Sequence, residues 1–180
     1  MPQLTPAFMF AALLSGSLTS NWLALLIAIV FSALIPTASI IVYWESGMDF
    51  FVDDKRKRVP LFITGTIAYS IGAILLFYIH APFIATALML AYAINTIVAA
   101  GLNVFYKVSI HTWGISGPTA ALFFQFGVVA LLIGFSMAFL VGIQRVATKA
   151  HTVGQVVAAV LVSFPLTIFV IYHIAPALIV

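Results

Sequence analysis

Residues 112–143 read TWGISGPTAALFFQFGVVALLIGFSMAFLVGI, an apolar stretch of 32 residues that decides how the chain folds. As one straight helix the stretch would extend about 48 Å, at 1.5 Å per residue, and would separate the polar residues at its two ends. As two helices with a break between them, it would return to the side on which it began. Gly127 is favoured over Gly134 as the break, because glycine readily adopts the conformations that end helices. The hydropathy of the stretch leaves both arrangements open.

The composition of the whole chain indicates a membrane protein. The 180 residues are 64 % hydrophobic and 6 % charged, whereas a soluble domain has about 25 % charged residues. So few charges cannot solvate a body of this size in water, which excludes an ordinary soluble enzyme, a disordered chain and a nucleic-acid-binding domain. Each helical span needs roughly 20 apolar residues. We therefore predict an all-α integral membrane bundle of about six transmembrane helices, with residues 1–180 forming a single domain.

Further apolar stretches supply the other crossings. They cover residues 21–44, 60–79, 83–105 and 156–180, and residues 4–18 are expected to form an extra short helix. Pro36 and Pro165 are expected to bend the first and the last of the four longer spans. Proline removes a backbone donor, and its ring clashes with the preceding turn of a helix.

The charged residues are confined to three polar clusters between these stretches. The first cluster runs from Glu45 to Arg58 and holds all four acids, the second begins at Lys107, and the third covers residues 144–155. Placing an ionisable side chain within the membrane costs free energy, so such residues are interpreted first as parts of a functional site. The first and second clusters are separated by two spans and lie on the same side. The third joins them only if residues 112–143 fold back.

The second and third clusters carry a pair of motifs. Residues 106–114 read YKVSIHTWG, and residues 145–156 read RVATKAHTVGQV, with five residues between Arg145 and His151 and three between His151 and Gln155. These motifs resemble the type 2 phosphatidic acid phosphatase superfamily of membrane lipid phosphatases, in particular its small prokaryotic members. The second signature of that family is Pro-Ser-Gly-His. The third is Ser-Arg, five residues, His, three residues, Asp.

The resemblance implies a role for each polar residue of the motifs. His151 would be the nucleophile that forms a phosphohistidine, and His111 would protonate the leaving oxygen and then activate water. Gln155, at the position of the family Asp, would orient the His151 ring without adding charge. The implied phosphate ligands are Arg145, Lys107, Ser109, Arg58 and Lys55. No metal ion and no cofactor is expected, because the basic side chains supply the positive charge.

Departures from the family pattern leave other functions open. The first family signature is Lys, six residues, Arg-Pro, but here an extra residue separates Arg58 from Pro60, and Phe51 stands at the lysine position. Val108 and Ile110 replace the proline and the glycine of the second signature, so the backbone is expected to wrap a phosphate less closely. The alternatives are a non-catalytic membrane protein that binds an anionic lipid or transports a small ligand, and a lipid phosphotransferase.

Other polar residues have simpler explanations. Basic runs such as residues 55–58 commonly anchor a loop at the cytoplasmic face or bind anionic headgroups. Asp49 and Asp53 resemble the Asp-x-x-x-Asp of membrane prenyltransferases, but the chain has no second acidic motif, so a metal site is not expected. Asn95 and Asn103 lie eight residues apart on one helix and are expected to form helix–helix hydrogen bonds.

The expected substrate is a lipid that carries a phosphate monoester or a diphosphate and keeps its tail in the bilayer. Polyprenyl diphosphates and phosphatidate-like lipids both fit this description. The protein is expected to be a multi-pass protein of the cell membrane, with no nucleic-acid partner. The surplus basic residues Arg56, Lys57 and Lys149 favour the cytoplasmic face for the site.

Overall fold

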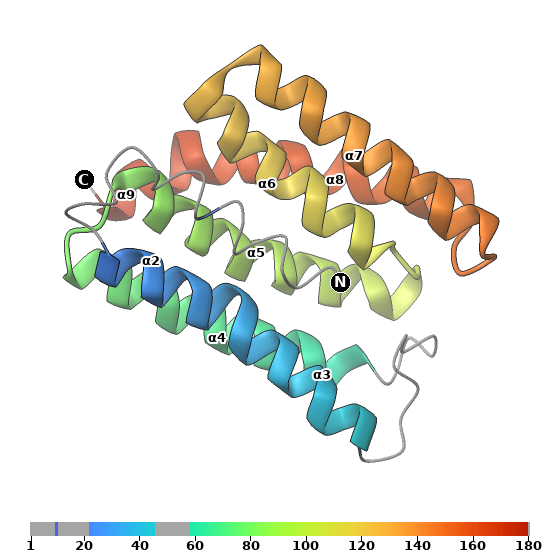
Figure 1. Ribbon diagram of the computed structural model, residues 1–180, viewed down its shortest axis with the longest axis horizontal. Helices are drawn as coiled ribbons and strands as arrows, with labels where there is room; N and C mark the ends of the chain where they lie inside the picture. The colour runs from blue at the N-terminus through green and yellow to red at the C-terminus, as the bar shows by residue number, and fades with distance from the viewer. Residues whose placement is uncertain (1–9, 11–21, 46–57, 180) are drawn as a thin grey trace.

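The computed structural model describes Phe10, residues 22–45 and residues 58–179, and the account below is confined to them. All regular elements in this part of the chain are helices, and they form six rods packed side by side (Figure 1). In chain order the rods are α2–η2–α3 (Trp22–Ile29, Val30–Leu34, Ile35–Glu45), α4 (Val59–Tyr78), α5 (Phe83–Phe105), α6 (Ile110–Phe126), α7 (Val128–Ala147) and α8–η4–α9 (Val153–Phe169, Val170–Ile174, Ala175–Ile179). Five rods, all except α6, are long and apolar enough to cross a membrane. The prediction of an all-α, multi-pass membrane bundle is confirmed.

The 32-residue apolar stretch forms two helices, and Gly127 is the break between them. Gly127 has a φ of 69° and a ψ of −153°, a backbone conformation that side-chain-bearing residues rarely adopt. Its N–H donates to the carbonyl of Phe123 at 2.8 Å and so ends α6. Gly134 lies inside α7, where its missing side chain makes room for Thr119 of α6. The resulting α6–α7 hairpin returns the chain to the end of the bundle from which α6 starts (Figure 1).

The central rod is α5, which is the most deeply buried of the five apolar rods. It packs closely against α4 on one side and also contacts α6 and α8. On the far side, α6 packs closely against both α7 and α8, whereas α7 and α8 contact each other only sparsely. The N-terminal helix expected over residues 4–18 lies outside the described residues except for Phe10. That side chain is fully buried, with its ring centroid 5.6 Å from that of Tyr92 on α5.

Two rods contain a π-helical segment directly before a proline. After η2, the N–H of Ile35 donates to the carbonyl of Val30, five residues earlier, and Pro36 comes next. After η4, the N–H of Ala175 donates to the carbonyl of Val170, and Pro176 comes next. The wider π-helical turn gives room to the proline ring, which clashes with an ordinary helical turn. Near Pro36, where a bend was expected, the helix changes to the π type. In the last rod the π-helical segment precedes Pro176, whereas α8 runs through Pro165 without a change of helix type.

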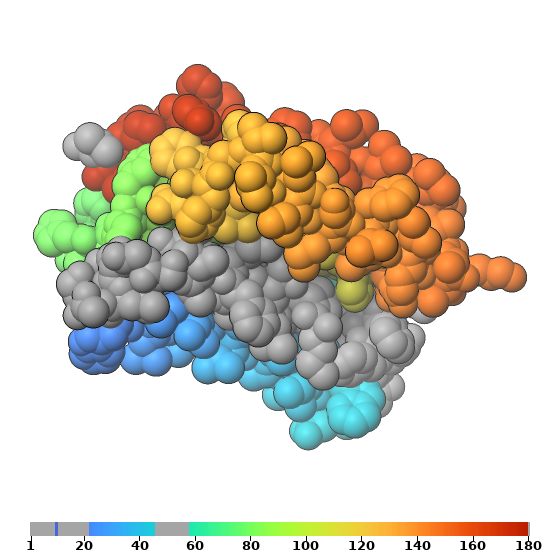
Figure 2. Space-filling model, turned by 45° about the horizontal axis from the view of Figure 1, so that its top comes forward, coloured from blue at the N-terminus to red at the C-terminus, as the bar shows by residue number. Residues whose placement is uncertain are grey.

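The outer face of the bundle is apolar. Figure 2 shows the α6–α7 hairpin, in amber and orange, covering one side of the molecule. The large exposed apolar side chains of α7 are Val128, Val129, Leu132, Ile133, Met137, Phe139, Leu140 and Ile143. A soluble protein rarely exposes so continuous an apolar surface, and hydrocarbon is the solvent that suits it.

Neutral polar side chains join three rods in the middle of the bundle. The Asn95 amide of α5 donates to Thr167 Oγ1 of α8 at 3.0 Å and accepts from Trp113 Nε1 of α6 at 3.0 Å. Ser116 of α6 is hydrogen-bonded to Ser163 of α8. All five side chains are buried. The prediction that Asn95 forms helix–helix hydrogen bonds is confirmed, and we call these five residues the mid-bundle network.

Candidate functional site

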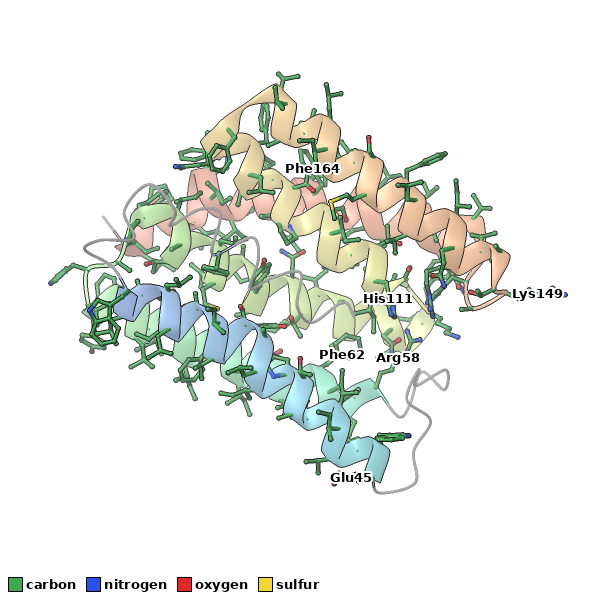
Figure 3. The ribbon with its side chains drawn as sticks, viewed as in Figure 1. Glu45, Arg58, Phe62, His111, Lys149 and Phe164 are labelled. Atoms are coloured by element: carbon green, nitrogen blue, oxygen red, sulfur yellow. The ribbon has the colours of Figure 1, made fainter. Side chains whose placement is uncertain are left out.

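The topology brings Arg58, the last residue of the first cluster, together with the second and third polar clusters at one end of the bundle. The start of α4, the end of α5, the start of α6, the end of α7 and the start of α8 all meet there (Figure 1). We call this region the polar end and define it as Arg58, residues 107–111 and residues 145–155. In Figure 3, Arg58 and His111 lie close together at this end, and Lys149 points away from the bundle. Lys55, one of the expected phosphate ligands, lies outside the described residues.

Direct hydrogen bonds connect the first cluster to the second and the second to the third. Arg58, at the N-cap of α4, donates through Nη1 to the carbonyl of Val108 at 3.4 Å. The backbone N–H of Ser109, at the N-cap of α6, donates to the carbonyl of Gln155 at 3.4 Å. The hydroxyl of Ser109 is hydrogen-bonded to that of Thr112 at 3.0 Å. Through these contacts the N-termini of α4, α6 and α8 are held together.

The turn after α7 brings Arg145 and His151 together. The N–H groups of Ala150 and His151 both donate to the carbonyl of Arg145, each at 3.1 Å. Lys149 adopts a left-handed conformation with a φ of 56°, which allows the chain to reverse here. Arg145 and His151 are each only 5 % exposed. The five-residue spacing in the sequence is therefore that of a tight turn which places a buried guanidinium and a buried imidazole next to each other.

Gln155 holds the imidazole ring of His151 in one orientation. His151 Nδ1 lies 2.9 Å from Gln155 Oε1, and the backbone N–H of Thr152 donates to the same oxygen at 3.2 Å. The N–H of Gln155 in turn donates to Thr152 Oγ1 at 3.3 Å, which completes a capping box at the start of α8. Because Oε1 is an acceptor, Nδ1 carries the proton when the ring is neutral. The lone pair is then on Nε2.

The surroundings of His151 favour its neutral form. Burial lowers the pKa of His151 from its ordinary value of 6.5, although the hydrogen bond with Gln155 opposes this shift. The nearby positive charges of Arg58, Lys107 and Arg145 lower the pKa further. At pH 7 the ring is therefore mainly uncharged.

His111 lies beside the same group of charges. It is the second residue of α6, is half-buried, and is close enough to Arg145, His151 and Arg58 to interact with them electrostatically. Two imidazoles and two guanidiniums thus meet at the polar end. A multiply charged anion is the ligand that such a set of groups attracts.

A cavity of about 390 Å³ opens at the polar end. Its lining residues are Lys107, Val146, Lys149, Ala150, His151, Thr152 and Gln155. A water molecule needs only about 10–15 Å³ of such space, so the cavity has room for a phosphate group and part of its ester. We call it the headgroup cavity. Both of its charged lining residues are lysines, which suits an anionic occupant.

The structure divides the expected site residues into two sets. His151, Gln155 and Lys107 line the headgroup cavity, whereas His111, Arg58, Arg145 and Ser109 lie beside it without lining it. Four lining residues were not expected in the site, and two of them, Lys149 and Thr152, have polar side chains. The spacing Thr-x-x-Gln at 152–155 is a sequence signal for the capping box, whereas Lys149 resembled a surplus loop charge.

The described part of the chain contains no group of three or more His, Cys, Asp or Glu side chains placed to hold a metal ion.

Comparisons with protein-family models, with curated proteins and with solved structures found no match for this chain.

Proposed function

We propose that the protein is a lipid phosphatase of the cell membrane that hydrolyses a lipid phosphate or a polyprenyl diphosphate through a phosphohistidine intermediate. The observation that carries this proposal is the His151–Gln155 pair at the wall of a cavity that Lys107 also lines. A neutral imidazole with its Nδ1 proton held by an acceptor presents Nε2 as a nucleophile. Placed beside buried arginines, such a group is suited to attack phosphorus.

In the first half of the reaction, the phosphoryl group moves from the lipid to His151. Nε2 attacks the phosphorus, and the bond between phosphorus and the ester oxygen of the lipid breaks. His111 then donates a proton to that oxygen; burial and the neighbouring cations disfavour its charged form, so it takes up this proton only once the negative charge of the bound phosphate lies beside it. The planar guanidinium of Arg145 is suited to pair with two of the remaining phosphoryl oxygens, and the Lys107 ammonium adds a point charge. These cations stabilise the negative charge that the transition state spreads over the oxygens.

In the second half, water releases the phosphate. His111, now neutral, takes a proton from a water molecule, whose oxygen attacks the phosphorus. The bond between phosphorus and Nε2 breaks, inorganic phosphate leaves, and both imidazoles return to their starting protonation states. Gln155 keeps the His151 ring in place throughout, but it brings no charge to stabilise the phosphohistidine.

Non-catalytic binding of an anionic lipid is a second candidate function, favoured by two contacts. Arg58 donates to a backbone carbonyl, and the Ser109 hydroxyl pairs with Thr112. These two expected phosphate ligands therefore already have protein partners. In this alternative the polar end would hold a headgroup by charge alone and leave its ester intact.

The test is phosphate release from purified full-length protein in detergent, measured with phosphatidate, lysophosphatidate and a polyprenyl diphosphate in the presence of EDTA. We expect release of phosphate from at least one of these lipids, and inhibition by vanadate as a mimic of the transition state. Loss of activity with EDTA would contradict the metal-free mechanism. Lipid binding without phosphate release would favour the second candidate. Transfer of the phosphoryl group to an added alcohol would indicate a phosphotransferase.

A further inference from the structure

A second hollow lies beside the headgroup cavity, and it is apolar. It is a groove of about 610 Å³ between α7 and α8. Its lining residues are Phe135, Ala138, Phe139, Gly142, Ile143, Val146, Ala147, Val153, Val156, Val157, Val160 and Leu161. None of these carries a polar side chain. Val146 lines both the groove and the headgroup cavity, so the two hollows adjoin each other at this residue.

The groove follows from the way in which three rods pack. Both α7 and α8 lie closely against α6 but contact each other only sparsely, which leaves a furrow between them. The helices come close together at Gly142, where an added Cβ would lie 2.7 Å from Val156 Cγ1. The lining positions of α7 recur every three or four residues and therefore form one face of that helix.

The length of the groove matches one leaflet of a bilayer. On α7 it extends from Phe135 to Ala147, a distance of about 18 Å at 1.5 Å per residue. Half of a hydrocarbon core roughly 30 Å thick is about 15 Å. The groove therefore extends from the polar end to about the middle of the membrane, which is the depth that one tail of an ordinary membrane lipid occupies.

We propose that this groove, the α7–α8 groove, holds a hydrocarbon tail of the same lipid whose phosphate occupies the headgroup cavity. The inference rests on the proposed function in so far as the cavity must take a lipid phosphate. An anionic head beside the two lysines and an apolar tail of leaflet length along α7 and α8 describe one amphiphilic molecule. The matching substrate is a phosphatidate-like lipid with acyl chains of ordinary length.

Photo-cross-linking tests this assignment without requiring turnover. The full-length protein is placed in lipid nanodiscs with a phosphonate analogue of phosphatidate, which cannot be hydrolysed, carrying a diazirine midway along one acyl chain. A neutral diacylglycerol with the same diazirine chain is the control for bulk lipid. We expect the phosphonate to label residues of the α7–α8 groove several-fold more than the neutral lipid does, as mapped by mass spectrometry.

A pair of tryptophan variants sharpens the test. Val157→Trp fills the groove and should reduce this labelling several-fold, whereas Leu140→Trp, on the exposed face of α7 outside the groove, should not. Equal labelling by the two lipids would overturn the inference, because it would mean that bulk lipid fills the groove. Labelling that misses α7 and α8, as when a second copy of the chain covers them, would also overturn it. Absence of phosphate release in the separate hydrolysis assay would contradict the proposed enzyme but not the labelling comparison.

Discussion

The mid-bundle network and the polar end both bury polar side chains, but they do so in different ways. In the network, Asn95 bridges Trp113 and Thr167 through neutral hydrogen bonds. At the polar end, the buried groups include the cations Arg58 and Arg145, and a cavity lies beside them. Neutral groups that satisfy one another stabilise helix packing in an apolar environment. Several cations gathered beside a cavity indicate a site for an anion. The two regions should therefore respond differently to mutation: the polar end through activity, and the network through stability.

The largest effect is expected from His151→Ala. If His151 forms the covalent intermediate, phosphate release should fall roughly a thousandfold or more, because no other group replaces the nucleophile. The rate is measured with the best lipid phosphate in detergent. His80→Ala is the matched control, since His80 lies in the turn between α4 and α5, at the other end of these rods. A rate in His151→Ala equal to that of the wild type would exclude the nucleophile assignment.

Arg145→Lys is expected to have the next largest effect. Lysine keeps the charge but not the planar fork that pairs with two phosphoryl oxygens, so kcat/KM should fall about a hundredfold. The thermal midpoint of the variant should stay close to that of the wild type, which would separate a catalytic defect from a folding defect. An unchanged kcat/KM would show that the guanidinium has no specific role in the transition state.

Gln155→Ala should lower kcat about tenfold, which corresponds to roughly 1.4 kcal/mol, and should leave KM nearly unchanged. The change frees the His151 ring to adopt unproductive orientations. It also removes half of the capping box, so Thr152→Ala is the matched variant: it weakens the same cap by about 1 kcal/mol but leaves the His151–Gln155 hydrogen bond in place. Gln155→Ala should therefore lose more activity than Thr152→Ala. Equal losses would assign Gln155 to the cap alone.

The pH dependence of the reaction should follow His151. Its pKa lies below 6.5, so the ring is neutral and nucleophilic above that pH, and kcat/KM should fall as the pH drops through the pKa. Gln155→Glu keeps an acceptor beside Nδ1 and adds a negative charge, which raises the pKa of His151. The acid limb of the pH profile should therefore move to higher pH in this variant. A shift to lower pH would contradict the proposed electrostatics.

The smallest effect on activity is expected in the mid-bundle network. Asn95→Ala removes the bonds to Trp113 and Thr167 and should lower the stability of the bundle by roughly 1–2 kcal/mol. Specific activity should stay within about twofold of the wild type, because Asn95 is not among the residues of the polar end. Thermal unfolding in detergent measures the first effect, with Ser136→Ala, an exposed position on α7, as the control. A large loss of activity in Asn95→Ala, with an unchanged thermal midpoint, would contradict the assignment of the network to stability and of the polar end to activity.

The sequence predicted that His151 and Gln155 lie together, but the reason, a shared helix face, was wrong. His151 precedes Thr152, the N-cap of α8, and Gln155 reaches back to its ring from the first turn of the helix, where it also completes the capping box. The sequence also identified Gly127 as the favoured break, since glycine tolerates a φ of 69°. Which expected ligands line the headgroup cavity was not predictable. Arg58 and Ser109 are in place but turn their polar atoms toward Val108 and Thr112, and only the packed structure shows those contacts.

The sequence by itself determined that this chain is a bundle of apolar helices with its charges in three clusters, because hydrophobic length and charge placement are local properties. Only the tertiary structure decided that Arg58 of the first cluster meets the second and third clusters. These clusters come together because α6 and α7 fold back against each other. That hairpin is stabilised by contacts between side chains that are distant in the sequence. The α7–α8 groove is likewise a property of helix placement, since both helices pack closely on α6 and only sparsely on each other.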